Sequence, residues 1–151
     1  FISLASFKGI KRRFDIHISN KNIVYIDDYA HHPEEIKSTV AGVIKSFPNR
    51  KLKVIFQPHL YSRTKDFAKE FAESLSISDE LVLLDIFPAR EEPIAGVDSK
   101  MLLDLCSNRS KSILKKEEVI SNLRENKNDL VLTLGAGDIS DLVKPIINIL
   151  S

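Results

Sequence analysis

The chain has 151 residues, of which 43% are hydrophobic and 28% are charged, and its formal net charge is +1. This composition is typical of one soluble globular domain and excludes an intrinsically disordered chain. A charge this small gives no reason to expect nucleic acid or an anionic membrane as a partner, and no apolar run approaches the ~18 residues of a membrane span.

The first third of the chain predicts two strands, a helix and a third strand. The segment 14–18 alternates apolar and polar residues, and this period of two predicts a half-exposed strand at a sheet edge. The apolar runs 22–26 and 52–56 predict strands that are covered on both faces. Between them, a helix is expected to begin near Pro33, because proline suits a first turn and apolar residues then recur at helical spacing up to Phe47.

The rest of the chain continues to alternate these two patterns. The expected elements are a helix around 67–75, a strand over 81–87, a helix over 101–105, a short strand over 112–114, a helix over 119–123, a strand over 130–134 and a helix over 139–150. Because Pro145 lies inside the last stripe, we expect a kink or a late helix start there. Alternating strands and helices predict an α/β domain with a mostly parallel sheet of about six strands and an antiparallel edge strand.

The single cysteine and the first residue bear on the cellular context. Cys106 excludes an intrachain disulfide, which fits a reducing compartment, and we interpret it as a small buried hydrophobic residue. The N-terminus has no signal-peptide pattern and begins with Phe1 rather than Met. We therefore expect residues 1–151 to be one domain of a longer protein, cut at a domain boundary.

Polar loops follow the predicted strands, and in an open parallel sheet ligands bind at the carboxyl ends of the strands. In the first loop, 27–33, the Asp28 carboxylate could accept hydrogen bonds from a ribose, and the Tyr29 ring could lie against a base. His31 and His32 could bind phosphate, move protons or hold a metal, but no third metal ligand has a recognisable spacing. A local role, with His32 capping the following helix, is an equal alternative.

The other polar groups are also open to two interpretations each. His59 and Arg63 follow the next strand, and an arginine at a helix start is either an anion site or an exposed charge. The same ambiguity holds for Arg12-Arg13. The loop 135–138, Gly-Ala-Gly-Asp, is similar to a phosphate loop, but a tight strand-to-helix turn explains it equally well. Because no G-x-x-x-x-G-K-[ST] motif is present, a triphosphate would need a cradle from elsewhere.

Taken together, these segments resemble the C-terminal domain of the Mur ligases. The stretches that carry the resemblance occur in the family's order and spacing along essentially the whole chain: KRRFD, DDYAHHPEEI, FQPHLYSRT, PAREEPIAGVDS and LTLGAGDI. HLYSRT and GVDS are similar to the members that add L-alanine to UDP-N-acetylmuramate. The resemblance implies a Rossmann-like, three-layer domain that packs against a central ATPase domain, which with a UDP-sugar domain is missing from this chain.

The resemblance also implies a cytoplasmic bacterial enzyme that uses ATP and Mg²⁺ to join L-alanine to UDP-N-acetylmuramate through an acyl phosphate. The chain alone is expected to be inactive, with Mg²⁺ held mainly by the central domain. The implied roles are nucleotide binding for Arg13, Asp28 and Tyr29, catalysis for His31 and His32, and substrate binding for His59, Arg63, Gly135 and Gly137. Some members carry arginine where this chain has Leu60, which leaves Arg63 as the main carboxylate anchor. The alternatives are a murein-tripeptide recycling ligase and a non-catalytic nucleotide-binding module.

Overall fold

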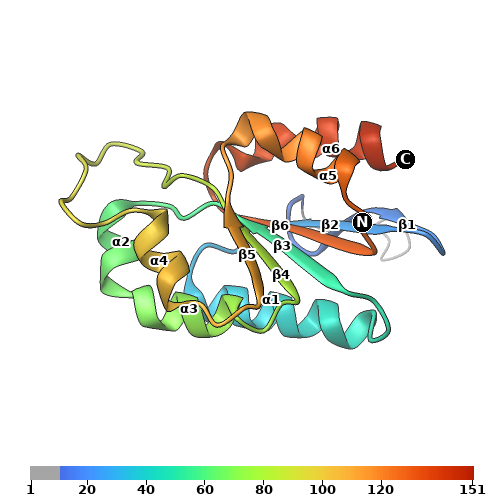
Figure 1. The fold of residues 1–151 in the computed structure, drawn as a ribbon, viewed down its shortest axis with the longest axis horizontal. Helices are drawn as coiled ribbons and strands as arrows, with labels where there is room; N and C mark the ends of the chain where they lie inside the picture. Colours follow the sequence, from blue (N-terminus) through green and yellow to red (C-terminus); the bar gives the residue numbers. More distant parts are fainter. Residues whose placement is uncertain (1–10) are drawn as a thin grey trace, which may run out of the picture.

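A six-stranded sheet lies between two layers of helices in residues 11–151, the part of the chain that the computed structural model describes (Figure 1). β1 (Asp15–Ser19) pairs antiparallel with β2 (Val24–Asp28) at one edge, and the other strand pairs are parallel. The strand order is β1-β2-β6-β3-β4-β5. The remaining strands are β3 (Leu52–Phe56), β4 (Glu80–Leu83), β5 (Ser110–Ile113) and β6 (Leu130–Leu134). The expected α/β class, mostly parallel sheet and antiparallel edge strand are confirmed.

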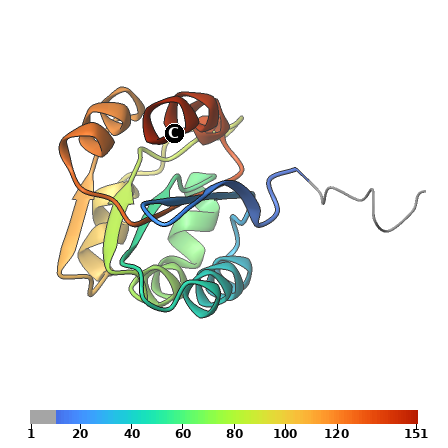
Figure 2. The same cartoon turned by 90° about the vertical axis from the view of Figure 1, so that its right-hand side faces the viewer.

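The helices divide between the two faces of the sheet, as Figure 2 shows from the side. The elements of one layer are α1 (Pro33–Ser46), α3 (Ala68–Leu75) and α4 (Ser99–Leu105), with α2 (Tyr61–Asp66) leading into α3. The other layer contains α5 (Val119–Glu125) and α6 (Val143–Leu150), each preceded by a short 3-10 helix. None of the helices within residues 11–151 is both long enough and apolar enough to cross a membrane.

Alternate residues of the central strands enter two separate apolar cores. Val24 and Ile26 of β2 pack with the α1 layer, whereas Tyr25 between them packs with α5 and α6. Because both faces are buried, β2, β3 and β6 are continuous apolar runs in the sequence. Cys106 is 3% exposed in the first core, as expected, and burial raises the pKa of its thiol to about 11.

The ends of two strands differ from the sequence predictions. β2 was expected to stop at Ile26, but it includes Asp27 and Asp28, because β6 continues alongside and pairs with both residues. β4 was expected to reach Phe87 but ends at Leu83, the last residue that is paired with β5. Two polar side chains that were expected in a loop are therefore fixed within the sheet.

The bounds of the helices near Phe67 and Pro145 can also be compared with the sequence predictions. The helix expected around 67–75 is α3, which begins at Ala68, and the additional short helix α2 precedes it and ends at Asp66. The late helix start expected at Pro145 is confirmed, because α6 begins at Val143 and proline occupies its first turn, where its missing N–H costs no intrahelical hydrogen bond.

Candidate functional site

The carboxyl ends of β2, β6 and β3 lie side by side. Asp28, the last residue of β2, pairs with Leu134 of β6, and Leu134 pairs on its other side with Phe56 of β3. The polar loops that follow these strands therefore leave the sheet at the same edge. This confirms the expected convergence of the loops.

A cavity of about 390 Å³ lies beside the end of β2. Its lining comes from the segment before β1, from the β2–α1 loop and from one side of α1: Arg13, Phe14, Asp28, Tyr29, Ala30, His31, Glu35, Ser38 and Thr39. Four of the residues predicted to be functional, Arg13, Asp28, Tyr29 and His31, are thus brought together in one wall. Arg13 is exposed there, so its guanidinium can reach an anion in the cavity.

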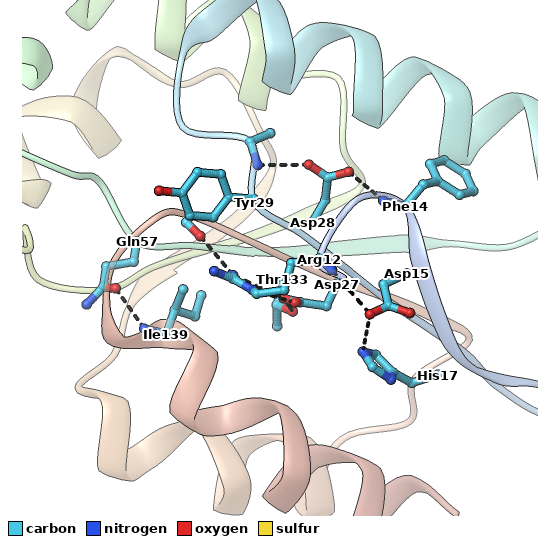
Figure 3. A network of polar contacts seen from close by, with 12 residues as sticks. Arg12, Phe14, Asp15, His17, Asp27, Asp28, Tyr29, Gln57, Thr133 and Ile139 are labelled. Carbon is cyan, nitrogen blue, oxygen red and sulfur yellow. Dashed lines mark hydrogen bonds and ion pairs between the residues drawn. The ribbon is translucent and has the colours of Figure 1, made fainter. Parts of the chain in front are cut away.

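Asp28 is built into the cavity wall by two backbone hydrogen bonds. Its Oδ2 accepts the N–H of Phe14 at 2.7 Å, and its Oδ1 accepts the N–H of Ala30 at 2.8 Å (Figure 3). The residue is 8% exposed. Since each carboxylate oxygen has two lone pairs, Asp28 can accept a further hydrogen bond from a ligand hydroxyl while it holds the two segments together.

Tyr29 presents an aromatic face at the mouth of the cavity. The residue is 42% exposed, and its ring meets that of His31 edge-on, with the centroids 5.0 Å apart. The guanidinium carbon of Arg12 lies 5.5 Å from the centre of the Tyr29 ring. An exposed, oriented ring of this kind can stack on a planar base.

The adjacent histidines point to different surroundings. The Nδ1 of His31 lies 3.0 Å from the carbonyl oxygen of Tyr29 and 3.6 Å from the Glu35 carboxylate. His32 immediately precedes α1, and its ring packs on Phe67 at 5.0 Å between centroids. The same Glu35 carboxylate accepts the N–H groups of His31 and His32, at 3.1 and 3.4 Å. His31 therefore belongs to the cavity, whereas His32 occupies the N-cap position of α1 without a capping hydrogen bond from its side chain, and its catalytic role stays a prediction.

Burial and hydrogen bonding act in opposite directions on Glu35. Partial burial raises the pKa of its carboxyl, but the N–H of His31, together with His32, outweighs this effect and holds the pKa below its usual value. Glu35 is therefore a stable anion at the start of α1, where the helix dipole also favours a negative charge. Within residues 11–151, no three His, Cys, Asp or Glu side chains form a group that could hold a metal ion.

His59 and Arg63 form a second polar group beside the first. The ring of His59 lies 6.1 Å from that of His31 and is stacked on Phe87 at 5.7 Å with an interplanar angle of 15°. Arg63 Nη1 is 3.1 Å from His59 Nδ1. A guanidinium can only donate, so His59 Nδ1 must accept and its proton resides on Nε2. Burial, then the charges of Arg63 and His31, lower the pKa of His59.

The loops after β3 and β4 are tied to each other around this group. Leu60 has φ 72°, an unfavourable conformation for a non-glycine residue, and its N–H donates to the Phe87 carbonyl at 2.9 Å. Ser62 donates both its N–H, at 3.1 Å, and its hydroxyl to Glu91, and these bonds lower the pKa of the Glu91 carboxyl. Glu91 thereby joins the loop after β4 to the start of α2.

Gly135 and Gly137 are required by close packing in the turn after β6. A Cβ on Gly135, which has φ 144°, would lie 2.9 Å from the carbonyl oxygen of Gln57. A Cβ on Gly137 would lie 2.5 Å from Gln57 Oε1 and 2.7 Å from Cγ of Phe87. Gln57 Oε1 also accepts the N–H of Ile139 at 2.9 Å. These contacts support the tight-turn interpretation, and a direct role in substrate binding stays a prediction.

A buried polar network beneath the site was not predicted. Arg12 Nε lies 2.7 Å from Asp27 Oδ2, and Asp27 Oδ1 accepts the Thr133 hydroxyl at 2.7 Å (Figure 3). The Tyr25 and Thr133 hydroxyls lie 2.9 Å apart, and burial raises the pKa of Tyr25. One signal was available, since Tyr25 and Asp27 are two positions apart in a strand and so share a face.

The chain matches a family model and curated relatives over most of its length. The family model described as "Mur ligase, glutamate ligase domain" matches residues 12–137. UDP-N-acetylmuramate--L-alanine ligase from Flavobacterium psychrophilum is 52% identical over 93% of this chain and 32% of its own length. The enzyme of that name from Parabacteroides distasonis is 50% identical over 97% of this chain and 32% of its own length.

A solved structure agrees with these relatives. The crystal structure of UDP-N-acetylmuramate-alanine ligase MurC from Thermotoga maritima superposes with a TM-score of 0.75 at 29% identity, covering 96% of this chain and 31% of that one. The chain thus spans about a third of the length of the curated relatives that it matches. The family match and these relatives together confirm the resemblance inferred from the loops: the chain belongs to the Mur ligase family, of which it carries the glutamate ligase domain.

Proposed function

We propose that the chain is the C-terminal domain of an ATP-dependent ligase that joins L-alanine to UDP-N-acetylmuramate in the bacterial cytoplasm, a step of peptidoglycan precursor synthesis. The observation that carries this proposal is the adjacency of two groups at one sheet edge. The cavity lined by Arg13, Asp28 and Tyr29 can take a nucleotide, and the His59–Arg63 pair next to it can take an amino acid. Close relatives bear the name of this ligase.

The nucleotide group fits an adenosine phosphate by its chemistry. Asp28 offers carboxylate oxygens for ribose hydroxyls, Tyr29 offers an exposed ring for a base, and Arg13 offers an exposed guanidinium for a phosphate. ATP would supply the phosphoryl group that activates a carboxylate. Since the 151 residues contain no P-loop motif, the triphosphate and Mg²⁺ would be held mainly by the central ATPase domain of the longer protein.

The amino-acid group fits a substrate that carries a carboxylate. The Arg63 guanidinium is held by a neutral His59 imidazole, which leaves its other N–H groups available for a bidentate contact with the L-alanine carboxylate. His31 lies between the two groups, 5.0 Å from the Tyr29 ring and 6.1 Å from the His59 ring, measured between centroids. A group in this position can contact the phosphate that is formed as the peptide bond closes.

The proposed reaction has two balanced steps. A carboxylate oxygen of UDP-N-acetylmuramate forms a bond to the terminal phosphorus of ATP, and ADP leaves. The L-alanine nitrogen then forms a bond to the acyl carbon, loses a proton, and phosphate departs as its bond to carbon breaks. Since water would hydrolyse the acyl phosphate, closure of this domain over the central domain would protect the intermediate by excluding water.

The test uses the full-length protein that contains this chain. We expect phosphate release and formation of UDP-N-acetylmuramoyl-L-alanine, detected by mass spectrometry, only when ATP, Mg²⁺, L-alanine and the UDP-sugar are all present. The isolated chain should show no turnover. Ligation of murein tripeptide in place of L-alanine would indicate the recycling enzyme instead, and micromolar ATP affinity of the isolated chain would contradict the division of the nucleotide site between domains.

Substituting Arg63 tests the amino-acid group separately. Arg63→Ala should raise the KM for L-alanine about 10- to 100-fold, because hydrogen bonds to a charged group are worth about 1.5–3 kcal/mol, and should change the KM for ATP little. Lys65→Ala, an exposed cation on the same short helix, is the matched control. If the two variants have the same KM for L-alanine, Arg63 does not bind the substrate carboxylate.

A further inference from the structure

We propose that Arg12 is a positioning residue for the nucleotide site, which locks the loop after β2 to the loop after β6 and fixes Tyr29 at the mouth of the cavity. This inference rests on the proposed function, because it concerns the same nucleotide. The wall of the cavity contains Arg13 of the arginine pair, whereas the Arg12 side chain turns toward Asp27 (Figure 3). Arg12 therefore acts through its neighbours.

The Arg12 guanidinium spans the ends of two neighbouring strands. Its Nε and Nη2 lie 2.7 and 3.4 Å from the two carboxylate oxygens of Asp27 in β2. Its Nη2 also donates to the carbonyl oxygen of Gly135, directly after β6, at 2.8 Å. The planar fork of a guanidinium can make these contacts together, and the single ammonium of a lysine cannot reproduce the geometry.

The main chain of Arg12 also holds Tyr29. The Arg12 carbonyl oxygen accepts the Tyr29 N–H at 2.6 Å, while the guanidinium lies 5.5 Å from the centre of the Tyr29 ring. Both the backbone and the ring of Tyr29 thus depend on the same residue. A base stacked on Tyr29 would be sensitive to the placement of Arg12, although no atom of Arg12 need touch the nucleotide.

The segment that carries Arg12 is held in an unfavourable conformation. Arg12 has φ 60° and Phe14 has φ 47°, values that non-glycine residues keep only where surrounding contacts impose them. The imposing contacts are visible in Figure 3: Asp15 Oδ2 accepts the Arg12 N–H at 3.2 Å, and Asp28 Oδ2 accepts the Phe14 N–H at 2.7 Å. Strain of this kind, maintained beside a cavity, is expected of a preorganised site.

The anchor of Arg12 is rigid because the Asp27 carboxylate is fully buried and fully paired. Asp27, Thr133 and Tyr25 are each 0% exposed. Thr133 donates to Asp27 Oδ1 at 2.7 Å, and its hydroxyl lies 2.9 Å from that of Tyr25. A satisfied polar network in an apolar surrounding favours one arrangement, so the guanidinium that it holds has a defined position.

The experiment compares two arginines of the full-length enzyme whose guanidinium groups each join two segments of the chain by hydrogen bonds. The Arg50 guanidinium binds the backbone carbonyls of Asp129 and Asn20, at 3.0 and 2.6 Å, and these lie before β6 and after β1, away from the cavity. Arg12→Lys should raise the KM for ATP about tenfold and leave the KM values for L-alanine and the UDP-sugar within about twofold. Arg50→Lys should lower the melting temperature but change none of the three KM values.

Three outcomes decide the inference. A selective rise in the KM for ATP in Arg12→Lys supports it. An unchanged KM for ATP, or an equal rise in all three KM values, overturns it and leaves Arg12 with a purely structural role. Failure of the proposed function would be seen separately, because the unaltered enzyme would then not couple ATP use to ligation of L-alanine.

Discussion

Gly137 is the described glycine at which an added methyl group would meet the closest atoms. In Gly137→Ala the new Cβ would lie 2.5 Å from Gln57 Oε1 and 2.7 and 2.8 Å from Cγ and Cβ of Phe87. The Gln57 side chain could rotate away, but only by releasing the N–H of Ile139, which it accepts at 2.9 Å. The Cβ of Phe87 is attached to the main chain, so relief there requires a backbone shift.

The expected loss of stability follows from these two responses. Forcing an extra methyl group into a packed site costs about 1–3 kcal/mol, and leaving a buried N–H without a partner costs about another 1–3 kcal/mol. The free energy of unfolding should therefore fall by about 2–6 kcal/mol, a large part of the stability of an ordinary domain. In a chain of this length, each kcal/mol lowers the melting temperature by roughly 2–4 °C.

Urea denaturation followed by circular dichroism measures this loss, and Gly42→Ala is the matched control. A Cβ on Gly42, inside α1, would lie 3.5 Å from Phe14, an ordinary contact, so alanine should stabilise the helix by about 0.5–1 kcal/mol. If Gly137→Ala changed the unfolding free energy by less than ~0.5 kcal/mol, the packing explanation would be wrong. The glycines would then have to be explained by contact with a ligand.

Two further predictions concern charges. Asp27→Asn should lower the free energy of unfolding by about 3 kcal/mol, because it leaves the mostly buried Arg12 guanidinium without its anion. Asp104→Asn, in an exposed ion pair, is the control and should lower it by less than about 1 kcal/mol. Equal losses in urea denaturation would contradict the effect of burial. Burial and the charge of Arg63 lower the pKa of His59 below its unfolded value of about 6.5. As the pH falls, the unfolded chain therefore binds the proton first. The stability should decline as the pH falls from about 6.5 toward the lower pKa of the folded protein. His59→Gln should reduce this decline in melting temperature between pH 7.5 and pH 5.5, and identical pH profiles would refute it.

Most of the architecture could be predicted because it depends on local patterns. Continuous apolar runs identified the bounds of β3 and β6, since both faces of those strands are buried and every residue must be apolar or paired. Parallel strands then require their polar loops to meet at one edge, which predicts that Asp28, His59 and Arg63 lie at the same edge of the sheet. Helical spacing did not predict α2, because that short helix has one buried residue, Thr64, and no apolar stripe of its own.

The details of the site could not be predicted because they depend on distant partners. Which arginine of Arg12-Arg13 enters the network is decided by the buried Asp27, whose other oxygen accepts a hydrogen bond from Thr133, 106 residues away. Likewise, the need for glycine at 137 comes from Gln57 and Phe87, which no local pattern connects to it.

The sequence alone thus determined the order of the strands and helices, the edge of the sheet where chemistry can occur and the family, since these follow from periodicity and from ordered motifs. Only the tertiary structure decided the role of each polar residue at that edge. A charge or a small residue acquires its function from the groups packed against it, and these come from segments that are far apart in the chain.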